Sequence, residues 1–433
     1  MSETLSPTQI DSVFGETAPS AQPAPVAEQS RISSLDFIRG IAVMGILFAN
    51  IISFGQPASA YIYPAAFLVP ANDPQGWQWI AQFVLIDGKM RGLFTLLFGA
   101  GLYLFMERAW ERGSTRGLQI WRLAMLLCFG LFHFYFIWFG DILAMYAIIG
   151  CVAVAFMHLQ PGFQMRFGLF AYIFGAVMLG GAMTFPYLIT DTSFGEVKGL
   201  ADVRAEMLAG LDTTLANEAR ITELKEAGDY PSLIAERFSQ QWWMPLFTPV
   251  FLFFETLPLM LMGMALYRFG FFSGEYDAGK MKLWGMTGVF GGGAATLALG
   301  LFVQSTGFTY NATNAAFIGW SVLPRLAMVM GMAALLVELS KSAIGWFGDR
   351  VRAAGRAAFT NYLGTSIVMM FVFQGWALGL FGDLNRPQLY LVAALTCAAM
   401  LAWSKPWLER FRYGPLEWLW RCLTYRKLFP LKR

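Results

Sequence analysis

A histidine and an aspartate in apolar surroundings are the first candidates for chemistry. His133 stands in the apolar stretch Gly-Leu-Phe-His-Phe-Tyr-Phe, and Asp141 follows it in a short turn. A carboxylate that orients an imidazole is the arrangement that a general base requires. The alternative is structural: His133 donates to a backbone carbonyl, while Asp141 caps the helix that follows.

Other charged residues lie at the edges of apolar segments. Asp36 and Arg39 are three residues apart, on one helical face, and Asn50 lies deeper on the same helix. They form a local ion pair, or the Arg39 guanidinium recognises a phosphate group, for which its forked geometry is well suited. A substrate contact is the functional interpretation of Asn50.

Two further groups of ionisable residues interrupt apolar stretches. Asp87, Lys89 and Arg91 would either bind a carboxylate or phosphate of a substrate at an outer mouth, or anchor their segment at the interface. Glu255 and Arg325 lie inside separate apolar runs, where an unpaired charge costs several kcal/mol, so we expect both to face the bundle interior. As partners they would form a structural ion pair that fixes helix register, or a functional one.

Several classes of site find no support in the sequence. The chain has no phosphate-binding glycine loop, no dinucleotide fingerprint and no zinc-type Cys/His spacing, and with two histidines a metal site is not expected. A net charge of +3 gives no reason to expect nucleic acid as a partner. The four cysteines do not suggest a disulfide framework.

Composition places these residues in a membrane protein. Of 433 residues, 57% are hydrophobic and 14% charged, against about 25% charged in soluble domains. Apolar runs of about 20 residues, enough to cross a core of roughly 30 Å, recur along the chain. We predict an all-α, polytopic membrane helical bundle with about ten transmembrane helices, at 41–54, 91–106, 122–138, 142–158, 167–189, 246–267, 283–303, 317–339, 357–381 and 388–404. A helix near the surface is expected at 77–86.

Basic residues alternate between successive loops, which predicts the orientation. Lys and Arg gather in every second loop and at the C-terminus, as expected of cytoplasmic segments, so both termini are predicted to be cytoplasmic in an inner membrane. The acidic loop between the fifth and sixth spans is then external, and its apolar spacing predicts one or two amphipathic helices. The organisation expected is a disordered tail (1–30), N-terminal transmembrane helices (31–189), a periplasmic helical loop (190–245), C-terminal transmembrane helices (246–404) and a basic interfacial segment (405–433).

Separate sequence blocks resemble one bacterial membrane family. The blocks 35–42 (Leu-Asp-Phe-Ile-Arg-Gly-Ile-Ala), 88–101, 130–133, 140–147 and 414–418, together with Glu255, Gly355-Arg356 and Thr360-Asn361-Tyr362, resemble the YeiB-like proteins over nearly the whole chain after residue 30. The N-terminal half is also similar to transmembrane acyltransferases related to heparan-α-glucosaminide N-acetyltransferase, which begin with Leu-Asp-x-x-Arg-Gly and carry an Asn on that helix. Those enzymes take acyl-CoA on the cytoplasmic side and acylate a sugar on the far side through a histidine.

The resemblance implies a transmembrane acyltransferase that uses acyl-CoA, such as acetyl-CoA, and acylates a glycan, lipid or small molecule. Asp36, Arg39, Arg356 and Asn361 would hold the cofactor, His133 with Asp141 would activate the acceptor, and Asn50, Lys89, Arg91, Glu255 and Arg325 would line the substrate path. The histidine of those enzymes falls in a loop that corresponds to 56–76, where this chain has none, so His133 would take its place. A transporter that uses the buried ionisable residues and a non-catalytic scaffold are the alternatives. Membrane lipids are expected neighbours, and a homo-oligomer is compatible with the sequence.

Overall fold

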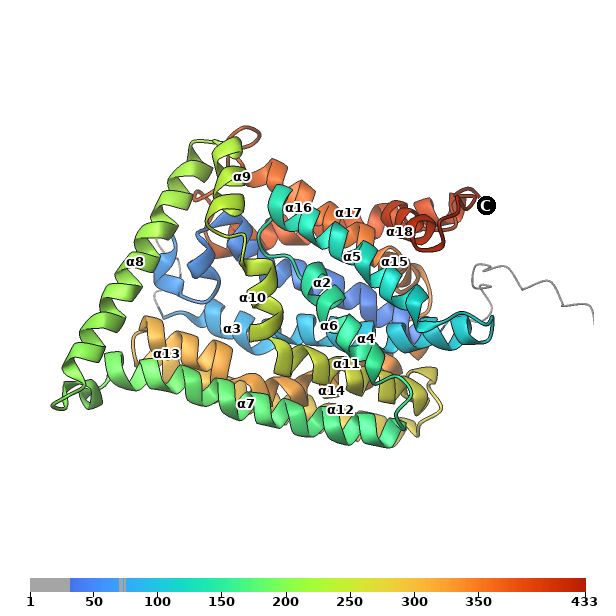
Figure 1. Ribbon diagram of the computed structural model, residues 1–433, viewed down its shortest axis with the longest axis horizontal. Helices are drawn as coiled ribbons and strands as arrows, with labels where there is room; N and C mark the ends of the chain where they lie inside the picture. The colour runs from blue at the N-terminus through green and yellow to red at the C-terminus, as the bar shows by residue number, and fades with distance from the viewer. Residues whose placement is uncertain (1–31, 70–72, 74) are drawn as a thin grey trace, which may run out of the picture.

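The computed structural model describes residues 32–69, 73 and 75–433, and within them the regular secondary structure is helical apart from one isolated bridge between Phe411 and Lys432. This confirms the predicted all-α bundle; the predicted tail 1–30 lies outside the described residues (Figure 1). The helices are α2 (Ser33–Gly55), α3 (Trp77–Leu85), α4 (Lys89–Trp110), α5 (Arg116–Phe136), α6 (Leu143–Ala155), α7 (Pro161–Asp191), α8 (Ala201–Glu226), α9 (Tyr230–Ser239), α10 (Met244–Phe251), α11 (Phe253–Arg268), α12 (Ala278–Ser305), α13 (Tyr310–Asn314), α14 (Val322–Ser342), α15 (Trp346–Arg356), α16 (Ala358–Phe373), α17 (Arg386–Arg410) and α18 (Pro415–Tyr425).

Nine of the ten predicted spans overlap one α-helix each, although the helices differ from them in length. Among the described residues, six helices are long and apolar enough to cross a membrane: α2, α5, α7, α12, α14 and α17. The predicted span 246–267 is instead a pair, α10 and α11, bent by 66° at Leu252, and counts as a seventh if the pair is one span. Two shorter apolar helices, α6 and α16, and the more charged α4 occupy the remaining predicted spans, so the count of ten stays a prediction.

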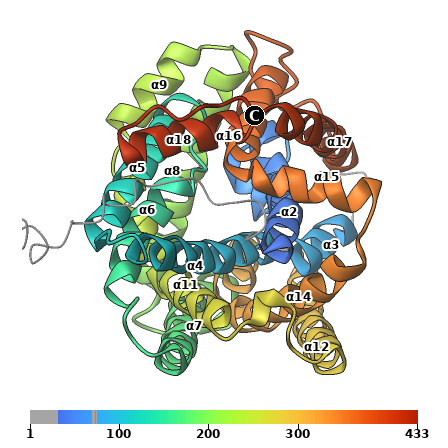
Figure 2. The same cartoon turned by 90° about the vertical axis from the view of Figure 1, so that its right-hand side faces the viewer.

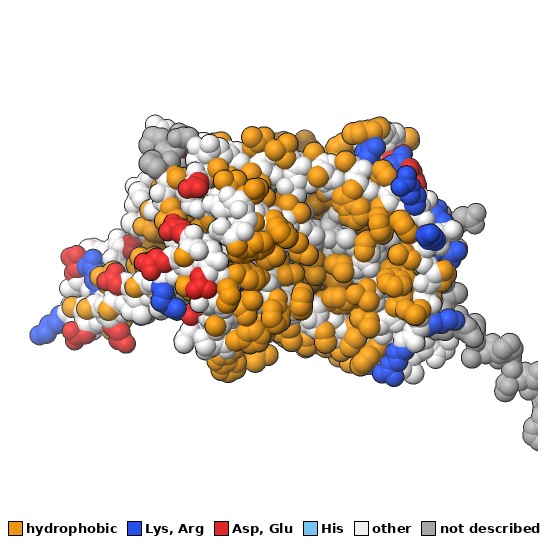
Figure 3. All heavy atoms as spheres, turned by 90° about the horizontal axis from the view of Figure 1, so that it is seen from above, with side chains coloured by type: hydrophobic (Ala, Val, Ile, Leu, Met, Phe, Trp, Pro, Cys, Tyr) orange, Lys and Arg blue, Asp and Glu red, His pale blue; other side chains and the backbone are white. Residues whose placement is uncertain are grey.

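The surface divides into an apolar band and two charged ends. Figure 3 shows hydrophobic side chains around the middle of the molecule, Asp and Glu gathered at the end that carries α8, and Lys and Arg at the opposite end. Ser33, at the start of α2, and Arg433 line one cavity, so the chain begins its first described helix and ends at the basic end. We refer to these as the acidic end and the basic end.

The predicted orientation places the basic end in the cytoplasm, and cysteine labelling tests it. In a background without the four native cysteines, Asp212→Cys on exposed α8 is expected to react with an impermeant maleimide added to whole spheroplasts. Ser342→Cys, exposed at the basic end of α14, is expected to react only after permeabilisation. Reaction of the second variant from outside would overturn the orientation.

Helix α2 lies at the centre and brings the basic-end residues together. It packs against α4, α14, α15, α16 and α17, and its crossing with α15 is the closest of these because glycines face backbone. A Cβ on Gly40 would collide with the carbonyl of Val351, and one on Gly355 with the carbonyl of Asp36. The crossing thereby sets Arg356 of α15 beside the Asp36 turn of α2.

The helix expected near the surface at 77–86 is present as α3. Its residues Trp79, Ile80 and Phe83 are buried and it packs against α12, whereas Trp77 and Leu85 are exposed. One side of α3 is therefore covered by protein and the other lies on the surface of the molecule.

The loop that is predicted to be external forms the helices α8 and α9, and α9 docks on the end of α5. Arg237 donates to the carbonyls of Phe134 and Tyr135, at 3.4 and 3.0 Å. Tyr230 donates to the Phe136 carbonyl, and the rings of Phe238 and Tyr135 stack at 4.2 Å. These carbonyls belong to the last turn of a helix, which has no intrahelical donors for them.

Candidate functional site

A cavity of about 350 Å³ opens at the basic end, between α2, α4, α5, α6, α15, α16 and α18. Figure 2 views this end, and α18 lies across it, packed on α5 and α16. The charged residues of the lining are six arginines and two carboxylates: Arg39, Arg108, Arg112, Arg122, Arg356, Arg421, Asp36 and Glu417. Such an excess of guanidinium groups favours an anionic ligand, because the planar fork matches phosphate geometry.

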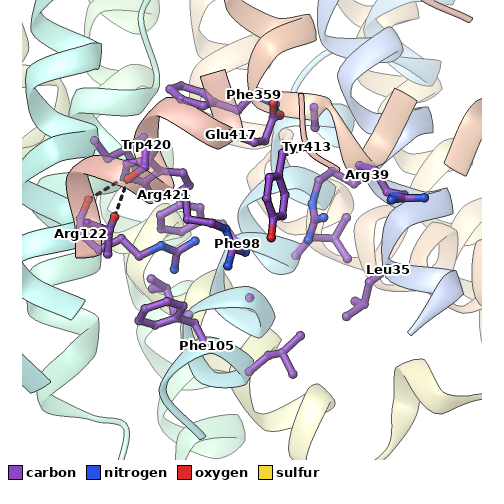
Figure 4. A pocket seen from close by; sticks show the side chains of 18 of the residues that line it. Leu35, Arg39, Phe98, Phe105, Arg122, Phe359, Tyr413, Glu417, Trp420 and Arg421 are labelled. Carbon is purple, nitrogen blue, oxygen red and sulfur yellow. Dashed lines mark hydrogen bonds between the residues drawn. The ribbon is translucent and has the colours of Figure 1, made fainter. Parts of the chain in front are cut away.

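Aromatic rings hold part of this arginine cluster in place. The Arg122 guanidinium lies between the rings of Phe105 and Trp420, 4.3 and 4.2 Å from their centroids. Trp420 in turn donates its indole N–H to the Arg122 carbonyl at 2.9 Å. Figure 4 shows Arg39 on the opposite side of the cavity from Arg122, with Tyr413 between them.

The predicted pair of Asp36 and Arg39 is present at this mouth. Their side chains form an ion pair of 3.1 Å, and both line the cavity. Both interpretations of the pair are therefore compatible with the structure. Arg356, also predicted, lines this cavity and a second polar one of about 420 Å³, and the two cavities share Asp36 and Arg356 as a common wall.

The inner end of the cavity is apolar and finishes at two tyrosines. Tyr146 is fully buried, its hydroxyl 2.7 Å from that of Thr95 and donating to the Arg91 carbonyl at 3.3 Å. The Tyr362 hydroxyl accepts from the backbone N–H of Ile142 at 3.3 Å. Both phenols line the cavity and are tied to neighbouring helices.

The predicted dyad of His133 and Asp141 lies directly behind Tyr362. Nδ1 of His133 is 2.8 Å from Oδ1 of Asp141, and Oδ2 of Asp141 accepts from the Ala144 N–H at 2.7 Å. Asp141 thus orients the imidazole and also caps α6, so parts of both interpretations are present. Nε2 of His133 is buried without a hydrogen-bond partner among the described residues.

His133 does not line the cavity. It is fully buried, and its ring lies 5.3 Å from the ring of Tyr362, which does line it. A buried ring nitrogen without a partner is unusual, since buried polar groups are nearly always paired. Tyr362 thus lies next to both the cavity and the imidazole of His133.

Glu255 and Arg325 face the interior and contact one another, as expected, and a third residue joins them. Arg325 donates from Nη1 to both carboxylate oxygens of Glu255 at 3.1 Å, while Arg91 donates to Oε1 at 2.9 Å. Arg325 also donates to the Phe317 carbonyl and to Ser321, at 2.8 and 3.0 Å. This buried triad joins α4, α11 and α14.

The predicted outer mouth formed by Asp87, Lys89 and Arg91 is not open. Lys89 is fully buried and donates to the Phe83 carbonyl at 2.5 Å, and Asp87 is buried beside Gln82. Arg91 is taken up by Glu255. Asp87 and Lys89 therefore stabilise the junction of α3 and α4, and Arg91, whose side chain is 23% exposed, is engaged by a buried carboxylate; their role in docking a substrate stays a prediction.

Two other residues predicted to bind cofactor or substrate, Asn361 and Asn50, lie outside the cavity lining. The Asn361 amide donates to the Ala354 carbonyl at 3.0 Å and to Ser404 at 3.2 Å, and its oxygen accepts from Trp403. It joins α15, α16 and α17 and is not among the residues that line the cavity, so its role as a cofactor ligand stays a prediction. Asn50 is half-buried in α2 and is likewise absent from the cavity lining.

Sequence reasoning missed most of the arginine cluster and its support. Arg108, Arg112, Arg122 and Arg421 were used only as indicators of membrane orientation, yet they line the cavity. Glu417 was noted only as part of a family block; its carboxylate accepts from the Phe359 and Thr360 N–H groups at 2.8 and 3.1 Å and so caps α16. The usable signal was the excess of arginine over lysine around one end. No cluster of three or more potential metal ligands occurs among the described residues.

Known proteins resemble this chain over most of its length. The chain is 28% identical to the uncharacterized protein YxaH of Bacillus subtilis over 94% of its own length and 98% of that protein. It is 28% identical to the uncharacterized protein YeiB of Escherichia coli over 92% of this chain and 97% of the relative. The chain is thus similar to YeiB over nearly its whole length. Residues 266–427 match the family described as a protein of unknown function, DUF418.

The YeiB-like relationship extends through nearly the full chain, which confirms the resemblance predicted from the sequence blocks. A third relative, an uncharacterized 39.9 kDa protein of Bacillus acidopullulyticus, is 25% identical over 94% of this chain and 97% of its own. No solved structure matches the chain. All three relatives are uncharacterized, so function has to be argued from the site.

Proposed function

We propose that this membrane protein is an acyltransferase that takes acyl-CoA into the arginine-lined cavity at its basic end. The observation that carries the proposal is one continuous arrangement: six arginines at and around the mouth, an apolar interior, and a His–Asp dyad behind the inner wall. Acyl-CoA has matching parts in the same order, namely phosphates, a slender arm and a reactive thioester. The thioester supplies the activated acyl group.

The mouth supplies the charge that the phosphates require. The lining carries four more arginines than carboxylates, since six arginines face Asp36 and Glu417. Glu417 is already bonded to the N-terminus of α16, and Asp36 to Arg39. Charge-assisted hydrogen bonds from guanidinium to phosphate are about twice as strong as neutral ones.

The dyad supplies the proton transfer. Asp141 holds Nδ1 of His133, which leaves Nε2 to accept the proton of an acceptor hydroxyl or amine. The acceptor oxygen or nitrogen then bonds to the acyl carbon, the carbon–sulfur bond breaks, and His133 returns its proton to the departing thiolate. Tyr362 separates the two sites at rest, so its ring has to rotate for the transfer to take place.

Acceptors are proposed to arrive from the acidic end. His133 lies in the last turn of α5, beneath the α9 helix that docks on that turn. An acceptor that enters beside α9 meets His133 without crossing the bundle. A glycan, a lipid or a small molecule with a free hydroxyl or amine fits this route.

The buried triad is better explained as structure than as a transport path. Both carboxylate oxygens of Glu255 are engaged by arginine, and Arg325 is anchored further by Phe317 and Ser321. A carrier needs an ionisable group that can leave its ion-pair partners during the transport cycle. The Glu255 carboxylate is instead held by Arg91 and by Arg325. We therefore keep transport as the outcome to which failure of the binding test below would point.

Substitution of Arg39 tests the proposal at the mouth. Arg39→Ala is expected to weaken acetyl-CoA binding by about tenfold or more, because a charge-assisted hydrogen bond contributes about 1.5–3 kcal/mol. Isothermal titration calorimetry on purified protein in detergent measures it. Arg116→Ala is the matched control, since Arg116 is exposed at the same end and does not line the cavity. Absence of acetyl-CoA binding by the unaltered protein would refute the acyltransferase.

A further inference from the structure

One face of α4 lines the cavity from its mouth to its inner end. Phe94, Phe98, Gly101, Phe105 and Arg108 recur every three or four residues and all belong to the lining. A helix rises 1.5 Å per residue, so the distance along α4 from Arg108 to Phe94 is about 21 Å. This distance is the usable depth of the cavity.

The depth can be compared with the arm of CoA. Twelve bonds separate the phosphate ester oxygen from the sulfur, and an extended chain advances about 3.3–3.6 Å for every three bonds, which gives about 14 Å. A phosphate bound between Arg108 and Arg122 therefore places the sulfur about 7 Å short of Phe94. That remainder is the space for the acyl group.

The inner end is closed by packed rings. Phe94 and Phe98 lie against Tyr146, with centroids 6.0 and 5.1 Å apart. Tyr146 is itself fully buried and hydrogen-bonded, and Leu143 beside it is also buried. A long acyl chain therefore finds a wall at this point, because well-packed interiors yield little to added atoms.

We infer that the cavity selects short acyl chains, of about two to five carbons, and that Phe94 with Tyr146 sets this limit. The inference rests on the proposed function, since it takes acyl-CoA as the ligand. About 7 Å accommodates five or six further bonds at the same advance per bond, whereas a sixteen-carbon chain needs about 18 Å. An acetyl, propionyl or butyryl group fits, and an octanoyl group already exceeds the space.

Displacement of radiolabelled acetyl-CoA from the detergent-solubilised protein tests the limit. Acetyl-CoA and butyryl-CoA are expected to compete with affinities within about threefold of each other, and octanoyl-CoA to bind at least tenfold more weakly. Phe94→Ala removes a ring from the inner wall and is expected to raise the affinity for octanoyl-CoA relative to acetyl-CoA by about tenfold.

A matched substitution at the mouth separates chain length from general damage. Phe105→Ala deletes the same ring on the same helix, but beside Arg122. This variant is expected to lower the affinity for all the acyl-CoAs by the same factor and to leave the ratio of the octanoyl-CoA and acetyl-CoA affinities unchanged. Equal binding of octanoyl-CoA and acetyl-CoA by the unaltered protein, or an unchanged ratio in Phe94→Ala, overturns the chain-length inference and leaves the proposed function standing. Failure of every acyl-CoA to bind overturns both.

Discussion

Replacing His133 with alanine is expected to lower acyl transfer by about 10²–10⁴-fold, which is the usual contribution of a positioned general base. The measurement is release of free CoA thiol from acetyl-CoA by protein in vesicles that are supplied with envelope extract as the source of acceptor. Acetyl-CoA binding should persist, because His133 lies behind Tyr362 and outside the cavity lining. The variant thus separates binding from chemistry.

Asp141→Asn and the second histidine complete this test. Asparagine preserves the shape of the Asp141 side chain but loses the charge that orients the imidazole, so activity should fall less far than in His133→Ala. His158, whose ring stacks on Trp110 at 4.8 Å, is the matched control, and His158→Ala should keep full activity. Unchanged transfer by His133→Ala would remove the dyad from the mechanism.

Breaking the buried triad is expected to have the largest effect on stability. Glu255→Leu leaves Arg91 and Arg325 as buried charges without their carboxylate, and removal of one partner from a buried pair typically costs about 3–5 kcal/mol. Thermal unfolding in detergent, followed by tryptophan fluorescence, should show a clearly lowered midpoint. Three helices lose their common contact in this variant.

Two further variants identify the origin of that loss. Glu338→Gln disrupts the pair of Glu338 with the exposed Lys341 on α14 and should cost no more than about 1 kcal/mol. The triple variant Arg91→Met/Glu255→Leu/Arg325→Met replaces every charge of the triad and should recover most of the stability, as buried ion clusters replaced by apolar residues often do. If Glu255→Leu unfolds like the unaltered protein, the triad contributes nothing to stability.

Helix positions followed from apolar runs, but their ends and bends did not. A run of about 20 apolar residues can be recognised from composition alone. The span predicted at 388–404 on this basis lies within helix α17 of the structure. The bend between α10 and α11 and the close crossing of Gly40 with α15 arise from tertiary contacts that no single run encodes. For the same reason α15, which is polar overall, was not anticipated.

The pairs of the site that could be predicted are those whose two residues lie close together in the sequence. His133 with Asp141 and Asp36 with Arg39 are close in the chain, and both pairs are present. Glu255 and Arg325 form an ion pair because an unpaired charge in an apolar interior has a high free-energy cost. The arginines that line the cavity come from helices distant in the sequence. Their excess over lysine is the one signal of the cavity that the sequence holds, and the positive-inside rule explains basic residues at this end equally well.

The docking of α9 on the end of α5 has a consequence for the order in which the chain folds during synthesis. The α5 carbonyls that Arg237 and Tyr230 satisfy are synthesised about a hundred residues earlier than those two side chains. While the ribosome is still making α6 to α8, the last turn of α5 has to rely on water for its hydrogen bonds. The surroundings of His133 are therefore completed only after α9 has been made and has packed back onto the end of α5.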